Sequence, residues 1–217
     1  MGTDWRAWHL AYDEPDSSLA RRLEVVRRMI GAWLDSAPAG RLRVISVCAG
    51  DGRDLLGALG RHPRRTDVTG TLVELDPGLA ATARERADAL GIDGLEVLVA
   101  DAGAATTYDG VAPADLLMIC GVFGNISADD IRATVMAAPA LCADGATALW
   151  TRHRRAPDLT SSIRVWWREA GFDEAEFAPV PQSLGSVGRE VRARRPAARP
   201  LPPTLFSFTG DGRGALR

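Results

Sequence analysis

The chain has 217 residues, 46% of them hydrophobic, and a formal net charge of −2. This length and composition suffice to bury the core of one domain with short appendages. The charge balance gives no electrostatic footprint for nucleic acid or membrane over the whole chain. All 26 basic residues are arginine, which is typical of bacterial genes with a high GC content. Without lysine, a pyridoxal phosphate Schiff base and a Walker-type phosphate site are excluded.

Cysteine usage and hydropathy bear on the compartment. Cys48, Cys120 and Cys142 are widely spaced and form no CxxC pair, so neither a disulfide framework nor a zinc knuckle is indicated. The first 30 residues contain acids and no apolar run of signal-peptide length. No stretch approaches the roughly 18 apolar residues of a membrane span. We therefore expect a soluble, cytoplasmic protein.

The first predicted element is an amphipathic helix capped by Asp16 or Ser17. Its apolar positions recur at steps of three or four: Leu19, Leu23, Val26, Ile30 and Trp33. Short apolar segments and helical segments then alternate. The predicted strands are 43–48, 68–74, 95–100, 115–120 and 146–150, and the predicted helices are 54–59, 79–90, 127–141 and 160–170. Pro139 should kink or shorten the third of these helices.

This alternation predicts the fold class. Strands of five to seven continuously apolar residues between helices are typical of a parallel sheet covered on both faces. Beyond residue 171, the segments 172–180, 185–191 and 204–208 are predicted to be strands without intervening helices. We therefore expect an α/β fold: a doubly wound, mostly parallel seven-stranded sheet with an antiparallel C-terminal end, plus an N-terminal helical lid or extension.

A candidate ligand site lies at the ends of the first three predicted strands, where an open parallel sheet binds its ligand. A glycine-rich turn follows the first strand, formed by Ala49, Gly50, Asp51 and Gly52. Glu74 ends the second strand, where a carboxylate accepts hydrogen bonds from ribose hydroxyls; a solvated acid is the alternative. Asp101 follows the third strand and would lie beside an adenine amino group; a helix cap is the alternative.

Over about residues 40–180, these segments resemble the class I methyltransferases that depend on S-adenosylmethionine (SAM). Residues 44–52 resemble their first motif, 73–77 their ribose-binding acid, 99–102 their adenine-side acid and 115–123 their fourth motif. The resemblance implies a Rossmann-like domain over residues 41–217, preceded by a lid and helix over 1–40, and a seventh strand inserted antiparallel. It also implies SAM as cofactor, bound by Ala49, Gly50, Asp51, Gly52, Glu74, Leu75, Asp101, Ala102, Cys120 and Gly121.

Two residues depart from the family pattern. Ser46 stands where the family usually has an acid, and Cys48 stands where it usually has a glycine. We expect Cys48 to pack as a small apolar residue, or to narrow the turn around the methionine part of SAM. Two other functions remain open. The first is a nicotinamide-dependent oxidoreductase, which is disfavoured because Leu55 occupies the place of the third glycine of GxGxxG. The second is a SAM-binding module without catalysis.

The chemistry expected of this site is metal-independent, in-line methyl transfer to a small molecule. The sulfonium makes the methyl group electrophilic, so the protein has to position the acceptor and, for a hydroxyl or amide, remove a proton. Metal-dependent relatives carry carboxylates at the end of strand five, where this chain has Thr151, Arg152, His153 and Arg154. We expect no metal here. An anionic acceptor would suit these cations, and a solvated loop is the alternative.

Three side chains are candidates for catalysis. His153 at the end of strand five is a candidate general base. The aromatic residues of segment 1–18 favour a lid over the site, in which Tyr12 touches the methyl or methionine end and His9 accepts the acceptor's proton. The alternative is that the tryptophans of this segment only pack it onto the domain. We expect a monomer or homodimer with no nucleic-acid or membrane partner.

Overall fold

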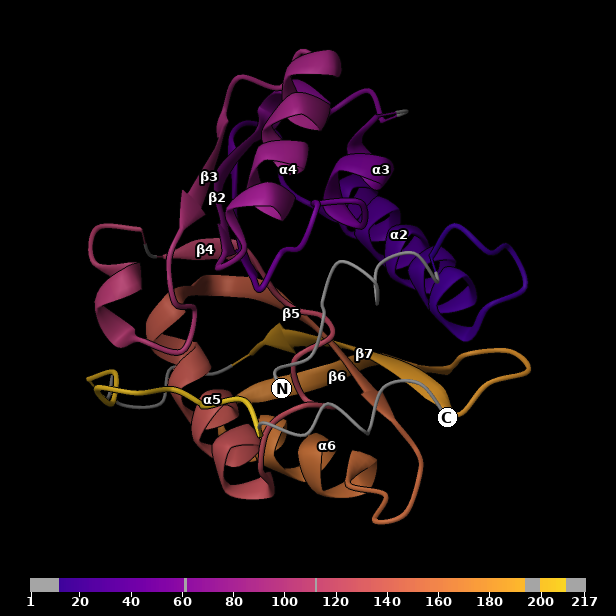
Figure 1. Cartoon of the computed structure of the whole chain (residues 1–217). Coiled ribbons are helices and arrows are strands. Elements are labelled where there is room, and N and C mark those ends of the chain that lie inside the picture. Colours follow the sequence, from indigo (N-terminus) through magenta and orange to yellow (C-terminus); the bar gives the residue numbers. More distant parts are fainter. Residues whose placement is uncertain (1–11, 61, 112, 194–199, 210–217) are drawn as a thin grey trace.

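The computed structural model describes residues 12–60, 62–111, 113–193 and 200–209. Within these residues, seven strands form one sheet in the order β3-β2-β1-β4-β5-β7-β6 (Figure 1). The strands are β1 (Leu42–Val47), β2 (Val68–Glu74), β3 (Leu95–Val99), β4 (Ala114–Ile119), β5 (Cys142–His153), β6 (Phe172–Pro179) and β7 (Gly185–Arg192). The predicted doubly wound α/β fold is confirmed.

The sheet is parallel from β3 to β5 and changes direction beyond β5. β7 runs antiparallel to both of its neighbours, β5 and β6, as expected for the C-terminal end. The prediction of a strand at 204–208 was wrong, because this segment forms only the isolated bridges of Thr204 with Ala104 and of Phe208 with Ile126. Its partners lie in the loops that follow β3 and β4. The segment therefore lies across the carboxyl ends of these strands instead of extending an edge of the sheet.

β5 is longer than predicted, spanning Cys142–His153 instead of 146–150. Its pairing with β4 shifts register between Ala114 and Leu116, and Gly145 adopts a φ of 74°. This irregularity interrupts the apolar pattern near the start of the strand. At the other end of the strand, Arg152 and His153 pair with Ser186 and Gly185 of β7, so they belong to β5 and not to the loop beyond it.

Helices cover both faces of the sheet (Figure 1). α2 (Ser18–Ser36), α3 (Leu55–Leu59) and α4 (Pro77–Ala89) lie on one face, and α5 (Ala128–Leu141) and α6 (Thr160–Glu169) lie on the other. The Ser17 hydroxyl caps α2 by accepting from Ala20 N at 2.9 Å, and Asp76 caps α4. Pro139 lies in the last turn of α5, which continues to Leu141 and so is not shortened at the proline.

The hydrophobic core has one cluster on each face, and β1 contributes to both. Leu42 and Val44 pack with α2, α3 and α4, whereas Ile45 and Val47 pack on the side of α5 and α6. Alternate residues of a strand point to opposite faces, so a strand buried on both sides is continuously apolar. α2 joins the same core as β1. The division of the chain at residue 40 stays a prediction.

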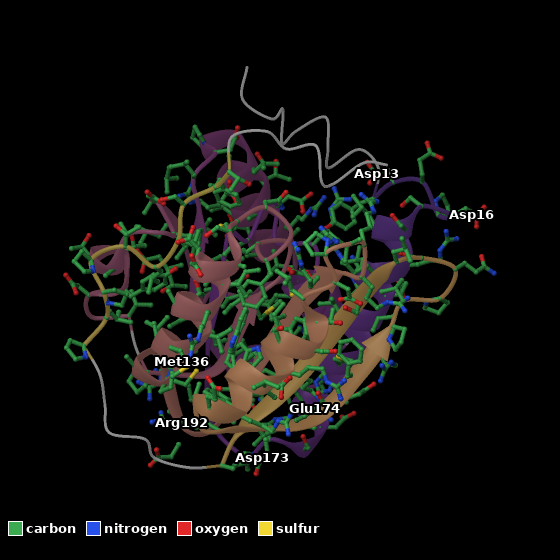
Figure 2. All side chains as sticks on the ribbon, turned by 90° about the horizontal axis from the view of Figure 1, so that it is seen from below. Asp13, Asp16, Met136, Asp173, Glu174 and Arg192 are labelled. Carbon is green, nitrogen blue, oxygen red and sulfur yellow. The ribbon has the colours of Figure 1, made fainter. Side chains whose placement is uncertain are left out.

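Charged side chains lie around the outside of this core (Figure 2). Asp13 and Asp16, before α2, lie at the end of the molecule away from Asp173 of β6 and Arg192 of β7 (Figure 2). In the part of the chain that the structure describes, no helix is long and apolar enough to cross a membrane.

Candidate active site

The turn after β1 is built from left-handed residues. Cys48, Gly50 and Gly52 have φ values of 53°, 60° and 68°. Glycine adopts this conformation freely, whereas another residue there costs on the order of 1 kcal/mol. Cys48 therefore holds a strained conformation where the resembling family has a glycine. Strain of this kind concentrates at functional sites.

A cavity of about 410 Å³ lies beside this turn, at the carboxyl ends of β1, β2, β3 and β4. Nine of the ten predicted cofactor-binding residues line it: Ala49, Gly50, Asp51, Glu74, Leu75, Asp101, Ala102, Cys120 and Gly121. Gly52 lies behind the cavity, where a Cβ atom would be 2.8 Å from Leu56 Cδ1. A larger groove of about 750 Å³ on the side of α2 and α3 shares Tyr12, Leu23 and Arg53 with this cavity but contains none of the predicted cofactor-binding residues. Cofactor binding by the nine residues stays a prediction.

Glu74 is a structural part of this cavity as well as part of its wall. Its side chain is 9% exposed, which rules out a solvated acid. Oε2 accepts a hydrogen bond from Gly50 N at 2.8 Å, and Oε1 accepts one from Asp76 N at 2.8 Å. The carboxylate thus links the turns after β1 and β2. Because each carboxylate oxygen has two lone pairs, both oxygens keep acceptor capacity for a ligand.

The rim beside Glu74 combines apolar and acidic groups. Leu75 is 67% exposed, and Phe208, at 42%, borders the same cavity. Asp101 Oδ1 accepts from Gly103 N at 2.8 Å within the turn after β3, and it does not cap the short helix at Ala105–Tyr108, whose N-cap is Ala104. Sequence reasoning missed Phe208, because its segment was assigned to the sheet.

The opposite end of the cavity is lined by two charged residues that sequence reasoning also missed, Arg53 and Asp54, and Arg22 contacts Tyr12 there without lining the cavity itself. The Tyr12 hydroxyl accepts from Arg22 Nη2. The Arg53 guanidinium lies 4.8 Å from the centre of the Tyr12 ring and pairs with Asp51 at 2.6 Å. The sequence signal for this group was a tyrosine before a helix and a DGRD turn, but their meeting depends on how α2 packs.

Burial controls the ionisation of this end of the cavity. It raises the pKa of Tyr12, against the opposing effect of Arg22, so the phenol stays protonated at neutral pH. It also raises the pKa of the Asp54 carboxyl. Both thiols that line the cavity, Cys48 and Cys120, have pKa values raised by burial and by nearby acids. They are therefore walls of the cavity and not nucleophiles.

A second cavity of about 540 Å³ adjoins the first at Gly121, which lines both. A Cβ atom at this glycine would meet no atom within 4 Å, so the space on this side is open. Gly121 N donates to Thr151 Oγ1 at 2.7 Å, and Asn125 Nδ2 donates to Gly121 O at 2.7 Å. The second cavity is polar and cationic; its lining includes Arg22, Asn125, Thr151, Arg152, His153 and Arg155.

The predicted catalytic histidines have different outcomes. His153 lies in the second cavity, and burial, with Arg152 and Arg155, lowers its pKa to about 4. The ring is therefore neutral at pH 7, where a base of this pKa takes up a proton weakly. His9 lies outside the described residues. Among the residues that are described, no group of three or more His, Cys, Asp or Glu side chains is placed to hold a metal ion.

An open α/β sheet with an antiparallel strand between β5 and β6, and with a glycine turn and an acid at the ends of β1 and β2, defines the fold of the class I SAM-dependent methyltransferases. The chain has this fold. It is similar to an O-methyltransferase family protein from Burkholderia thailandensis, with a TM-score of 0.66 and 20% identity. That match covers 89% of this chain and 61% of the other, so the chain spans about three fifths of that protein.

Two further solved structures carry the cofactor or its demethylated product. Magnesium protoporphyrin IX methyltransferase from Synechocystis PCC 6803, with bound SAM, has a TM-score of 0.62 and 14% identity over 81% of each chain. An RNA methyltransferase from Salinibacter ruber, in complex with S-adenosyl-L-homocysteine (SAH), has a TM-score of 0.54 and 16% identity over 82% of this chain and 95% of the other. No protein-family model and no curated protein matches the sequence.

Proposed function

We propose that the protein transfers the methyl group of SAM to a small-molecule acceptor. The observation that carries this proposal is the cavity of about 410 Å³, in which the left-handed turn, Glu74 and Asp101 meet. Neighbours of the same fold that hold SAM or SAH support the choice of cofactor. Bound SAM supplies an electrophilic methyl group, so the chain has to bind SAM and the acceptor, orient them toward each other and exclude water.

The nucleoside end of SAM fits the acidic and apolar groups at the ends of β2 and β3. The ribose hydroxyls are donors for Glu74, whose oxygens keep acceptor capacity beside their two backbone hydrogen bonds. Leu75, exposed on the rim, supplies apolar surface for the adenine ring. Asp101 uses only Oδ1 for a hydrogen bond within the described residues, so Oδ2 would be free to accept from the adenine amino group.

The methionine end of SAM fits the charged groups around Tyr12. This part of SAM is a zwitterion, and the cavity carries both complementary charges there, in Asp54 and Arg53. An ammonium beside Asp54 would offset the burial that raises the pKa of its carboxyl. We assign the ammonium to Asp54 and the carboxylate to Arg53.

Metal independence is part of this proposal. It is supported by the residues at the end of β5, which are Arg152, His153 and Arg154 where a metal-dependent enzyme needs carboxylates. With excess chelator, turnover is expected to be unchanged. A loss of turnover that magnesium restores would contradict this part of the proposal.

The segment 1–18 is proposed to close over the cofactor. Tyr12 supports this role, because it borders the cavity and contacts Arg22 and Arg53. Limited proteolysis should cut this segment in the free protein and spare it when SAH is bound. Equal cleavage in both states, or full activity after deletion of residues 1–14, would reject the lid.

The two other functions are separated by the fold and by turnover. A nicotinamide-dependent oxidoreductase is disfavoured because Leu55 is fully buried where a dinucleotide site needs glycine, and because β7 interrupts the dinucleotide strand order. A SAM-binding module without catalysis would bind SAM and never consume it. The cytoplasmic location and the monomeric or homodimeric state stay predictions.

The direct test is turnover of SAM with pools of small molecules, followed by mass spectrometry of SAH and of the acceptor. We expect SAH in equal amount to a product heavier by one CH₂ group than its acceptor. The Glu74→Ala variant should lose most of this turnover at limiting SAM. Binding of SAM without SAH formation in any small-molecule pool would reject methyl transfer to a small molecule.

A further inference from the structure

The second cavity is placed to hold the molecule that receives the methyl group. It shares Gly121 with the proposed cofactor cavity, and a Cβ atom added to this glycine would meet no atom within 4 Å. Its volume of about 540 Å³ is within the range of small-molecule sites. The ligand that it takes is not defined by the proposed function. Its chemistry has to be derived from the side chains of the wall.

Arg152 is the most constrained of these side chains. It is 9% exposed, and burial lowers the pKa of its guanidinium. Among the described residues, the guanidinium donates one hydrogen bond, from Nη1 to Phe123 O at 2.6 Å, and its buried Nε has no partner. A guanidinium has five N–H donors. Arg152 is therefore a buried cation with most of its donors unused by the described residues.

Asp158 is the acid that acts electrostatically on Arg152, but it does not pair with it. Asp158 acts on it only through space, and its Oδ1 accepts from Thr160 N at 2.9 Å and from Thr160 Oγ1 at 2.7 Å. Asp158 thus accepts hydrogen bonds from Thr160, the first residue of α6, instead of pairing with the arginine. A buried charge without a partner is unfavourable, so a guanidinium in this position is stabilised by an anion that the cavity admits.

The rest of the wall adds no competing negative charge, since its described lining contains no Asp or Glu. The Arg152 carbonyl accepts from Ser186 Oγ at 2.8 Å, which fixes the end of β5 against β7. His153 is neutral at pH 7, because burial lowers its pKa to about 4, and its buried Nδ1 has no partner among the described residues. The neutral ring can give one hydrogen bond to a ligand without repelling an anion.

We propose that the second cavity is the acceptor site and that Arg152 pairs with a carboxylate or phosphate group of the acceptor. The inference rests on the proposed function only in naming the ligand a methyl acceptor. The planar guanidinium fork matches both oxyanions in a two-point contact. The anionic group would hold the acceptor at the end of β5, so that the remainder of the molecule extends toward Gly121 and the cofactor.

The experiment measures binding of three one-ring probes to the full chain saturated with SAH: benzoate, phenyl phosphate and the neutral benzamide. Ligand-detected NMR gives the dissociation constants. At least one oxyanion is expected to bind at least about tenfold more tightly than benzamide, and the one that binds more tightly identifies the group. Equal binding of all three probes would overturn the proposal. So would a dissociation constant above 10 mM, a binding free energy weaker than about 2.7 kcal/mol, for both oxyanions.

Two variants and a control localise the effect. Arg152→Gln should weaken oxyanion binding at least about tenfold, and Arg152→Lys, which keeps the charge, should weaken it less. Arg154→Gln is the matched control, because Arg154 lies two residues away, donates to Ser183 O and does not line the cavity. It should change oxyanion binding less than twofold. Equal losses for Arg152→Gln and Arg154→Gln would mean that only the general positive charge matters.

The readouts separate this inference from the proposed function. SAH affinity should be the same in the wild type and in both glutamine variants, since neither residue lines the cofactor cavity. If SAH binds but the oxyanions do not, the acceptor class is wrong and the proposed function stands. If SAH fails to bind the folded wild type, the proposed function fails, and the probe comparison without SAH still tests the oxyanion site.

Discussion

Replacing Glu190 by glutamine should stabilise the protein in alkaline solution and not in acid. Glu190 of β7 is fully buried, and its Oε1 accepts from Trp150 Nε1 at 3.1 Å. Oε2 has no hydrogen-bond partner among the described residues. Burial raises the pKa of the carboxyl to about 7, and Glu174, its register partner on β6 (labelled in Figure 2), adds to the rise. The hydrogen bond from Trp150 opposes it.

The sign and size of the effect follow from this pKa. Between pH 4.5 and pH 7 the folded state holds a proton on Glu190 that the unfolded state has lost, so stability falls as pH rises through this window. At 1.36 kcal/mol per pKa unit, the full loss is about 3 kcal/mol. Glutamine keeps an acceptor for Trp150 and has no charge to bury. From pH 5 to pH 8, Glu190→Gln should therefore gain about 2 kcal/mol relative to the wild type.

Urea unfolding at pH 5 and at pH 8 measures this gain, and the comparison of two pH values cancels effects of the amide that do not depend on pH. Glu169→Gln, at an exposed position of α6, is the control and should change by less than about 0.5 kcal/mol at either pH. A stability difference between Glu190→Gln and the wild type that is the same at pH 5 and pH 8 would refute the assignment of a buried, titrating carboxyl.

Three further predictions concern the two cavities. Glu74→Ala should weaken SAM binding by about 1.5 to 3 kcal/mol, because it removes a charged acceptor; calorimetry showing unchanged affinity in a folded variant would reject this role. Gly52→Ala should lower the free energy of unfolding by about 1 to 3 kcal/mol, because φ is 68° and the new Cβ would lie 2.8 Å from Leu56; wild-type stability in urea would contradict the turn geometry. His153 binds a proton more weakly in the folded state than in the unfolded state, so the wild-type free energy of unfolding should fall by about 1 to 2 kcal/mol as pH drops from 6.5 to 4, after allowance for solvent screening. An equal fall in the His153→Gln variant would show that other groups cause this loss of stability.

Much of the fold and the nucleoside end of the site could be predicted from the sequence, because both depend on local patterns. Apolar strands between helices define the parallel sheet, and the residues just after each strand must meet at one edge of it. Gly50, Glu74 and Asp101 were therefore placed correctly relative to one another. The hydrogen bond from Gly50 N to Glu74 is a consequence of this geometry.

The parts that could not be predicted depend on contacts between distant segments. Arg22 of α2 contacts Tyr12, which lines the proposed cofactor cavity, only because of how α2 packs, and this contact between distant residues leaves no periodic signal in the sequence. The segment of Phe208 was wrongly predicted to be a strand of the sheet, because a short apolar segment has the same sequence pattern whether it pairs with a sheet edge or with loops. The sequence left two roles open for Arg152 and Arg154, an anion site or a solvated loop, because it does not indicate which of the two side chains points inward. The structure buries Arg152.

Calorimetric titration of the full chain with SAM, SAH and NAD tests the central claim most directly. SAM and SAH are expected to bind at one site per chain, and NAD at least about a hundredfold more weakly, since the cavity offers acids for one nucleoside and Leu55 blocks a dinucleotide turn. Binding of NAD as tightly as SAM, or no binding of SAM and SAH by the folded protein, would contradict the account.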